Sequence, residues 1–398
     1  MIQRVEYLNS LISFKDKKLI KVITGIRRCG KSTLLELFQN HLLSNNINAE
    51  QIIFINLEEG EYDEIENHKQ LYHFVNDRIL PDKKMYIFLD EVQRVKDFQK
   101  AVDSLYVKKN CDVYITGSNA HLLSGELATL LSGRYVEIQM LPLSFKEYVS
   151  FFSNNNNLER LYANYIQYSA FPYALEIEDR KNRRLYLQSI YDTIVLKDII
   201  ARKRFPDIAM LKSVTRFMFD NIGNLCSTKK IADTMTSEGR KITVHTVESY
   251  LTALTDSFIL YQISRYDIKG KQYLKTGDKY YVADIGLRYA LLGTKRADMG
   301  HVLENVVFLE LLRRGYEIHI GKVGNAEVDF IAFGEEGEEY YQVAYTVIDA
   351  NGETLKRELA SLEAIRDHNP KYLLTMDNTP PTSHNGIKQL NVLDWLMS

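Results

Sequence analysis

The sequence of 398 residues has few cysteines and no long apolar run. Its three cysteines are too few and too dispersed for a disulfide framework or a cysteine-rich zinc site, so a reducing compartment fits best. No uncharged apolar run reaches the length of a membrane span, and Met1 to Lys18 scatter charges among apolar residues. We therefore expect a cytoplasmic protein with no membrane segment and no export signal.

Net charge is also nearly absent. A formal charge of -2 gives no overall attraction to nucleic acid, so any such binding must rest on a local basic face. A hydrophobic content of 45% and a charged content of 26% are typical of a globular chain and argue against disorder. The length predicts roughly two to four domains.

The stretch from Gly25 to Ser32 reads GIRRCGKS and fits the pattern G-x-x-x-x-G-K-[ST]. It lies between a strand-like run, residues 19–24, and a helix-like run, residues 33–43, which favours a phosphate-binding loop over a glycine turn before an ordinary helix. Glycine leaves room for backbone N–H groups to surround a phosphate, and the helix adds its positive dipole end. The expected nucleotide-binding residues are Gly25, Ile26, Arg27, Arg28, Cys29, Gly30, Lys31, Ser32 and Thr33.

Two carboxylates follow another apolar run. Residues 85–89 read as a strand that ends in Asp90 and Glu91, and open α/β sheets bind their ligands at the carboxyl ends of strands. We expect Ser32 and Asp90 to hold Mg²⁺, Lys31 to reach the β- and γ-phosphates, and Glu91 to polarise the attacking water. Taken alone, such a run more often enters a solvated turn, but the phosphate loop upstream favours the catalytic interpretation.

Small polar residues follow the next strand-like run. Residues 112–116 precede Gly117, Ser118 and Asn119, which are expected at the same edge of the sheet. Either Ser118 or Asn119 would sense the γ-phosphate or position the water, and the sequence does not choose between them. A helical segment over 125–133 then leads to Arg134 and a fifth strand over 135–140.

This order of motifs resembles the AAA-type ATPases, with Walker A and Walker B motifs, a polar strand end and Gly-Arg before a fifth strand. More narrowly, LSGR at 131–134, LPLSF at 141–145 and Phe171-Pro172 are similar to poorly characterised prokaryotic AAA ATPases that carry a C-terminal domain of unknown function. The resemblance implies ATP hydrolysis with Mg²⁺. It also implies that Arg134 is an arginine finger that completes a neighbouring subunit's site in a homo-oligomer. The alternative is a surface arginine at a helix end.

Residues 151–205 are expected to form a helical lid or connector, with helices over 158–168 and 181–202. In this family such a lid folds over the nucleotide. Residues 169–172 resemble a glycine-glycine-aromatic-proline turn that brings a proline near the adenine, although Ser169 and Ala170 replace both glycines. Pro172 is therefore either an adenine contact or the first residue of a helix.

Residues 206–299 resemble a winged-helix module. Helices are expected over 227–235 and 243–259, followed by a β-hairpin that turns at 269–271. From Pro206 to Gly300 there are 14 Lys and Arg against 10 Asp and Glu, which allows DNA binding, with a packing module as the alternative. The basic excess lies on Arg240, Lys241, Arg265, Lys269, Lys271, Lys275 and Lys279. If DNA binds, the second helix would enter the major groove with His245, Thr246, Glu248 and Ser249 outward, and the hairpin lysines would meet phosphates.

Residues 300–398 predict a helix, three strands, a helix and a strand, an order that resembles the restriction-endonuclease-like fold. The resemblance places Glu304, Asp329 and Gln342 at the positions that hold Mg²⁺ in that fold. Ala344 stands where the fold has a lysine, so it cannot supply an ammonium for phosphodiester cleavage. We expect a degenerate, inactive nuclease-like domain, unless Lys322 replaces the lysine from another direction.

Together these patterns predict an α/β protein in four parts. They are an AAA-type P-loop NTPase core at 1–150, a helical lid at 151–205, a winged-helix module at 206–299 and a restriction-endonuclease-like domain at 300–398. The expected function is Mg²⁺-dependent ATP binding and hydrolysis. The alternatives are an ATP-regulated DNA-binding or partner-binding switch with little turnover, or a metal-dependent nuclease. The sequence names neither a protein client nor an oligomer size.

Overall fold

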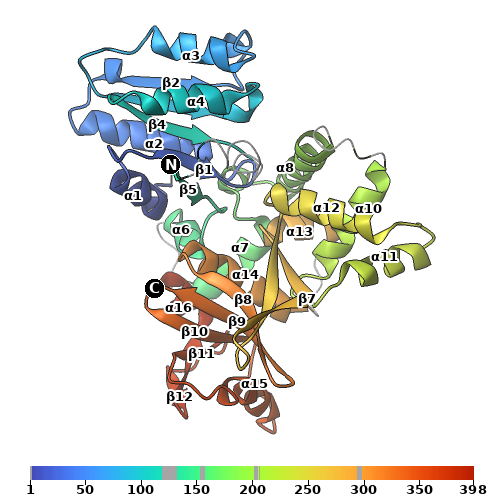
Figure 1. Ribbon diagram of the computed structural model, residues 1–398. Coiled ribbons are helices and arrows are strands. Elements are labelled where there is room, and N and C mark those ends of the chain that lie inside the picture. The colour runs from blue at the N-terminus through green and yellow to red at the C-terminus, as the bar shows by residue number, and fades with distance from the viewer. Residues whose placement is uncertain are drawn as a thin grey trace. The chain divides into compact units, whose positions relative to one another are not determined.

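The computed structural model describes residues 2–118, 131, 133–152, 157–200, 205, 207–293 and 298–398 (Figure 1). The chain divides into a first unit, Met1–Pro142 with Asp256–Phe258, and a second unit, Leu143–Thr255 with Ile259–Ser398. Asn119, all of the expected helix over 125–133 except Leu131 and Gly133, Arg202 to Arg204 and Pro206 lie outside the described residues. In the described part of the chain, no helix combines the length and the apolar character that a bilayer crossing requires.

Within these ranges the first unit holds a five-stranded parallel sheet in the order β2-β3-β4-β1-β5. Strands β1 (Ile20–Thr24), β3 (Met85–Asp90) and β4 (Cys111–Thr116) are buried along their whole length, as inner strands of a parallel sheet should be. Strands β2 (Ile52–Asn56) and β5 (Tyr135–Gln139) form the edges. This arrangement confirms the predicted α/β core and brings the carboxyl ends of β1, β3 and β4 to one edge.

Two helices of the first unit, α1 (Val5–Ser13) and α4 (Phe98–Val107), were not predicted. Helix α3 (His68–Asn76) begins where the Asn67 side chain accepts from the N–H groups of Lys69 and Gln70. The remaining helical segments are α2 (Lys31–Ser44), η1 (Ala49–Gln51), η2 (Gly60–Tyr62) and η3 (Val92–Arg94).

The second unit, as far as the chain is described, holds an eight-stranded sheet in the order β12-β13-β11-β10-β9-β8-β6-β7. The predicted hairpin of β6 and β7 forms, but β6 also pairs in parallel with β8, with Arg265 opposite Ile320. The sheet therefore crosses residue 300, where the sequence predicts a domain boundary, and the four-part division stays a prediction. The strands are β6 (Leu260–Asp267), β7 (Gln272–Val282), β8 (Glu317–Val323), β9 (Ala326–Gly334), β10 (Gly337–Ala344), β11 (Lys371–Thr375), β12 (Thr382–His384) and β13 (Ile387–Asn391).

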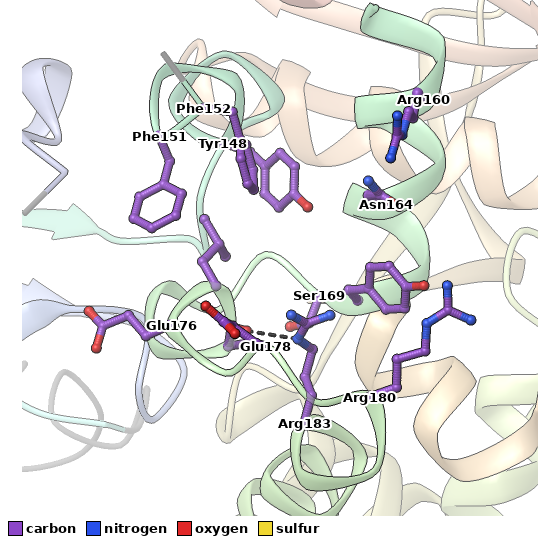
Figure 2. A pocket seen from close by; sticks show the side chains of 13 residues that line it. Tyr148, Phe151, Phe152, Arg160, Asn164, Ser169, Glu176, Glu178, Arg180 and Arg183 are labelled. Carbon is purple, nitrogen blue, oxygen red and sulfur yellow. Dashed lines mark hydrogen bonds between the residues drawn. The ribbon is translucent and has the colours of Figure 1, made fainter. Parts of the chain in front are cut away.

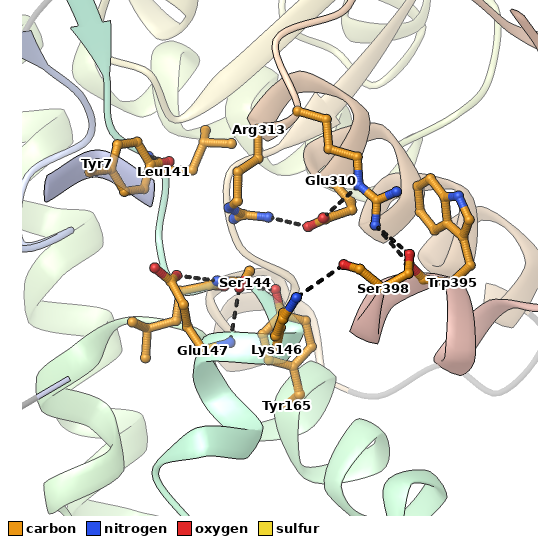
Figure 3. A network of polar contacts seen from close by, with 12 residues as sticks. Tyr7, Leu141, Ser144, Lys146, Glu147, Tyr165, Glu310, Arg313, Trp395 and Ser398 are labelled. Atoms are coloured by element: carbon orange, nitrogen blue, oxygen red, sulfur yellow. Dashed lines mark hydrogen bonds and ion pairs between the residues drawn. The ribbon is translucent and has the colours of Figure 1, made fainter. Parts of the chain in front are cut away.

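Helices of the second unit pack on this sheet and on one another. Phe308 of α14 stacks on Tyr281 of β7 with ring centroids 4.6 Å apart, and Leu362 of α15 joins an apolar cluster with Val328 and Tyr340. Figure 3 shows the start of α6, where Ser144 and Glu147 cap the helix reciprocally. The helical segments are α6 (Phe145–Ser150), α7 (Leu158–Tyr168), η5 (Pro172–Glu176), α8 (Arg180–Thr193), η6 (Ile194–Ile200), α10 (Ile208–Asp220), α11 (Thr228–Ser237), α12 (Val244–Asp256), α13 (Ile285–Leu292), α14 (Met299–Arg313), α15 (Glu353–Glu363) and α16 (Val392–Met397).

Two helical glycines of the second unit differ in the space around them, which gives a test of its packing. A Cβ at Gly286 of α13 would lie 2.2 Å from the nitrogen of Ser169, so Gly286→Ala should lower the free energy of unfolding by about 1–3 kcal/mol. At Gly300 of α14 nothing lies within 4 Å, and Gly300→Ala should leave stability unchanged or raise it slightly. Denaturant unfolding of both variants measures the difference, and equal losses would contradict this packing.

Candidate functional site

The phosphate-loop segment joins the carboxyl end of β1 to α2, which begins at Lys31. Gly25 and Gly30 have φ angles of 142° and 108°, values that L side chains rarely adopt. A Cβ at Gly25 would also lie 2.1 Å from the carbonyl oxygen of Met140, which follows β5. Both glycines of the motif are therefore required by the backbone as it stands.

The Lys31 side chain lies along the inside of this loop. Its Nζ donates to the carbonyl oxygens of Gly25 at 3.0 Å and Ile26 at 3.3 Å, and lies 3.9 Å from Oε1 of Glu91. The residue is only 4% exposed. A buried ammonium at the start of a helix is a localised positive charge, and neutral carbonyl groups compensate it only in part.

Asp90 and Thr116 end the neighbouring strands β3 and β4 and are hydrogen-bonded to each other. The Thr116 hydroxyl donates to Oδ1 of Asp90 and accepts from the N–H of Glu91 at 2.9 Å. Burial raises the pKa of Asp90, while hydrogen bonds from Ser32 and Thr116 act in the opposite direction. In the described part of the chain, Oδ2 of Asp90 is buried without a hydrogen-bond partner. The site thus contains a carboxylate oxygen that still needs a donor or a cation.

Glu91 adopts a strained backbone conformation at this edge. Its φ of 52° lies in the left-handed region, which is uncommon for a residue other than glycine. Thr116 holds its N–H, and the side-chain amide of Gln93 donates to Oε2 of the carboxylate. This left-handed conformation changes the direction of the chain directly after β3, and the Glu91 carboxylate then lies beside Lys31.

Ser118 lies next to the end of β1. Gly117 donates its N–H to the carbonyl oxygen of Ile23 at 3.1 Å, which ties the segment after β4 to the strand that precedes the phosphate loop. Ser118 is 2% exposed, and its hydroxyl has no hydrogen-bond partner among the described residues. Because Asn119 lies outside those residues, the choice between the two stays open.

Arg134 lies at the opposite end of β1. Ile20, the first residue of that strand, donates its N–H to the carbonyl oxygen of Arg134 at 2.8 Å, whereas the phosphate loop follows the last residue. The Arg134 side chain is 44% exposed, pairs with Asp103 of α4 and lies 5.7 Å from the ring of Tyr106. The fold therefore keeps Arg134 about 16 Å along the strand from its own phosphate loop.

Arg4 contacts the phosphate loop, and the sequence patterns did not indicate it. Its side chain is 3% exposed and donates to the carbonyl oxygens of Cys29 at 2.9 Å and Leu141 at 2.6 Å. The Tyr7 hydroxyl accepts from the N–H of Leu141 at 3.1 Å, and both residues are labelled in Figure 3. Arg4 thus ties the loop to the segment after β5. A lone arginine near the start of a sequence gives no signal of such a contact.

Pro172 begins η5 in the second unit, which is a position that proline favours. Three residues earlier, Ser169 has a φ of 88° where the resembling turn has glycine, and its hydroxyl accepts from the N–H of Phe171. A cavity of about 590 Å³ opens beside Ser169 (Figure 2). On its wall Arg183 donates to the carbonyl oxygen of Ala174. Pro172 is not among the residues that line this cavity, and its contact with adenine stays a prediction.

Glu304 of α14 and Asp329 of β9 come together around Lys279 of β7, which contradicts one prediction. The sequence placed Lys279 near DNA phosphates, but this residue is 4% exposed, and its Nζ lies 2.8 Å from Oε1 of Glu304. The prediction was wrong because β7 continues past the hairpin turn into the sheet. Lys279, and not Lys322, brings an ammonium to the predicted nuclease-like positions.

The Gln342 side chain is hydrogen-bonded to other groups of the second unit. Its side-chain oxygen accepts from the N–H of Asp329 at 3.3 Å and from the Ser361 hydroxyl, and its nitrogen donates to Glu358 at 2.8 Å. Among the residues that the structure describes, no group of three or more His, Cys, Asp or Glu side chains is arranged to hold a metal ion. The predicted Mg²⁺ ligands of the C-terminal domain thus bind protein groups in this structure.

The other basic residues expected near DNA differ in their surroundings. Lys269 and Lys271 are exposed at the hairpin turn. Arg240 instead donates to the carbonyl oxygen of Ala209 at 3.2 Å. DNA binding through this surface stays a prediction.

Comparison with known proteins places the chain in a family. A family model described as an AAA domain matches residues 17–149. An uncharacterised protein of Haemophilus influenzae is 42% identical over 401 residues, which cover 100% of this chain and 99% of that protein. The uncharacterised protein MJ1544 of Methanocaldococcus jannaschii is 31% identical over 365 residues, which cover 87% of this chain and 79% of that protein. The chain belongs to the AAA-domain family.

Two further matches extend beyond the AAA domain of this protein. Residues 159–298 match a model described as a domain of unknown function (DUF8612). The Walker-type ATPase paby2304 of Pyrococcus abyssi superposes with a TM-score of 0.51 at 16% identity, covering 73% of this chain and 96% of that chain. That likeness shows a shared fold. The resemblance to AAA-type ATPases is confirmed, together with a C-terminal region of unknown function.

The Thr116 hydroxyl can be tested with one substitution that removes it and one that keeps it. Thr116→Val keeps the branched shape but leaves the buried N–H of Glu91 without its acceptor, so any ATP turnover at this edge should fall by about 10–100-fold. Thr116→Ser keeps the hydroxyl and should retain most of the activity. Phosphate release measured beside circular dichroism separates loss of activity from loss of fold. Equal activity of the valine and serine variants would remove the hydroxyl from the mechanism.

Proposed function

We propose that this AAA-family protein binds ATP with Mg²⁺ and hydrolyses it at the carboxyl edge of the sheet in the first unit. The observation that carries the proposal is Oδ2 of Asp90, which is buried and has no hydrogen-bond partner among the described residues, while Oδ1 accepts from Thr116. Ser32 of the phosphate loop is near enough to act on the pKa of this carboxyl. Lys31 and Glu91 lie 3.9 Å apart beside it. A metal ligand, a phosphate-binding cation and a candidate base are thus gathered at one edge.

The residues present fit Mg²⁺ and a nucleoside triphosphate. Ser32 and Asp90 offer the oxygen ligands that Mg²⁺ prefers, and when bound the ion neutralises charge on the β- and γ-phosphates. The Lys31 ammonium would exchange the carbonyl oxygens of its own loop for phosphate oxygens, a stronger electrostatic partner. Glu91 would orient the attacking water and accept its proton, and Ser118 would hydrogen-bond the γ-phosphate or that water.

Arg134 would act on a neighbouring subunit's nucleotide. Its place at the amino end of β1 keeps it away from its own phosphate loop, and its exposed side chain pairs at the surface with Asp103. Surface pairs of this kind are weak, so the arginine can exchange Asp103 for a phosphate. A homo-oligomer is thus part of the proposal.

The second unit would change its conformation or its partner binding in response to the nucleotide bound in the first unit. Helices α11 and α12 followed by the β6–β7 hairpin support the winged-helix assignment, and the order from α14 through β11 supports the restriction-endonuclease-like one. Exposed Lys269 and Lys271 support DNA as a partner, although exposed Glu248 on α12 opposes it.

Substitution of Lys31 and Glu91 tests the reaction. Lys31→Ala should abolish ATP binding, because the loop loses its cation. Glu91→Gln should keep binding and lower turnover by about 100-fold or more, because the amide cannot accept a proton. Glu36→Gln, the same change on the exposed side of α2, is the control and should behave as wild type. If the wild type and both site variants released phosphate at one rate, hydrolysis at this edge would be excluded.

Mixing two inactive variants tests the role of Arg134. Arg134→Ala should bind ATP but lose turnover, because no arginine reaches the neighbouring phosphate. When it is mixed with Lys31→Ala, the intact phosphate loop of an Arg134→Ala subunit can lie next to the intact Arg134 of a Lys31→Ala subunit. Activity should therefore return in the mixture. Light scattering with and without ATP gives the assembly size. Full activity of Arg134→Ala, or a monomer under turnover conditions, would contradict the proposal.

A further inference from the structure

Lys279 of β7 is surrounded by carboxylates from two other elements of the second unit. Its Nζ lies 2.8 Å from Oε1 of Glu304 on α14, 2.9 Å from Oε1 of Glu327 on β9, and 3.8 Å from Oδ1 of Asp329 on β9. The side chains of Lys279 and Glu304 are 5% and 7% exposed, that of Asp329 is 14% exposed, and that of Glu327 is 32% exposed. The ammonium is therefore the point at which all three carboxylates converge. We call these four residues the Lys279 cluster.

The remaining polar contacts of the cluster hold the carboxylates toward this point. The Tyr281 hydroxyl donates to the same Oε1 of Glu304 that receives Lys279. The N–H of Val343 donates to Oδ2 of Asp329 at 2.9 Å, which leaves Oδ1 facing the lysine. Two carboxylates are thus fixed by groups of the sheet independently of Lys279.

The cluster needs a cation on physical grounds. Burial by itself lowers the pKa of a lysine, but the attraction of Glu304, Asp329 and Glu327 outweighs it and raises the pKa of Lys279 above its ordinary value. The ammonium therefore stays charged. Burial and the Glu304 carboxylate raise the pKa of Asp329 to about 8, whereas Lys279 acts to lower it. Without the ammonium, Asp329 would face Glu304 with no cation between them, a costly arrangement unless Asp329 takes up a proton.

We propose that the Lys279 ammonium is the built-in cation of this cluster and occupies the place that a divalent metal ion would need. Oε1 of Glu304, Oε1 of Glu327 and Oδ1 of Asp329 all face Nζ, and any metal ion bound by this cluster would need the same oxygens. A metal ion and the ammonium cannot share that point, because both are cations and both need these oxygens. The second unit therefore assembles its carboxylates without a metal.

The arrangement differs from that of an active nuclease site whose catalytic lysine comes from another position in the sequence. A catalytic ammonium has to lie beside the substrate, next to a metal that the carboxylates hold. Here the ammonium lies between the carboxylates themselves. The pairing also links the hairpin strand β7 to α14 and β9. The positions that resemble a nuclease site thus serve to join elements of the second unit.

The test replaces the ammonium with an apolar group of similar length and asks whether a metal takes its place. The full-length protein is compared with Lys279→Met and with Lys322→Met, the control on β8, all free of nucleotide. The probe is MnCl₂, with free Mn²⁺ measured by electron paramagnetic resonance and stability by thermal unfolding. Omitting nucleotide keeps the measurement independent of the proposed ATPase activity.

Without metal, Lys279→Met should unfold about 10 °C below wild type, because its buried carboxylates lose their cation. Mn²⁺ should bind this variant at least about tenfold more tightly than wild type and restore most of the lost stability. Lys322→Met should match wild type in both measurements. An unfolding temperature of Lys279→Met that does not respond to Mn²⁺ would overturn the proposal, since the carboxylates would then not form a cation site.

A second measurement does not depend on whether Lys279→Met folds. Wild type and Glu304→Gln, both with Lys279 in place, are titrated with MnCl₂ under the same conditions. Both should bind equally little Mn²⁺, because the ammonium holds the site. Binding to wild type that Glu304→Gln removes would show that a metal and Lys279 coexist, and the proposal would be wrong.

Discussion

The hydroxyl of Thr116 is the contact on which the geometry of the proposed ATP site depends. It donates to Asp90 and accepts from the backbone of Glu91, so one oxygen atom joins the ends of β3 and β4. Without that acceptor, the left-handed turn at Glu91 would have no partner for its N–H, and the carboxylate would lose its fixed position beside Lys31. Parallel pairing of the two strands brings these groups to one edge, and a single hydroxyl then sets their orientation.

The fold of the first unit could be predicted because its signals are local. Gly25 and Gly30 satisfy a backbone requirement that shows directly in the sequence, and the apolar run before Asp90 is long enough to mark a buried inner strand. The start of α3 also has a local sequence signal, because Asn67 and Gln70 form a capping box within four residues.

What the sequence could not predict depends on pairs of distant residues. Arg4 donates to Leu141, which lies near the other end of the first unit in the sequence. Lys279 contacts Glu304 because β6 pairs with β8, which makes the β6–β7 hairpin part of the second sheet. No local pattern encodes either contact. The hairpin lysines were grouped by sequence position, whereas burial separates Lys279 from the exposed turn.

The charge balance of the Lys279 cluster has a consequence for how this region can change during evolution. Loss of the lysine alone leaves carboxylates facing one another, and loss of Glu304 alone leaves the ammonium with fewer partners. Either single change therefore passes through a less stable protein. Substitutions at these positions should appear together in relatives, either as a joint loss of opposite charges or as an exchange of the lysine for a bound metal. The cluster thus constrains three elements of the second unit to diverge as a group.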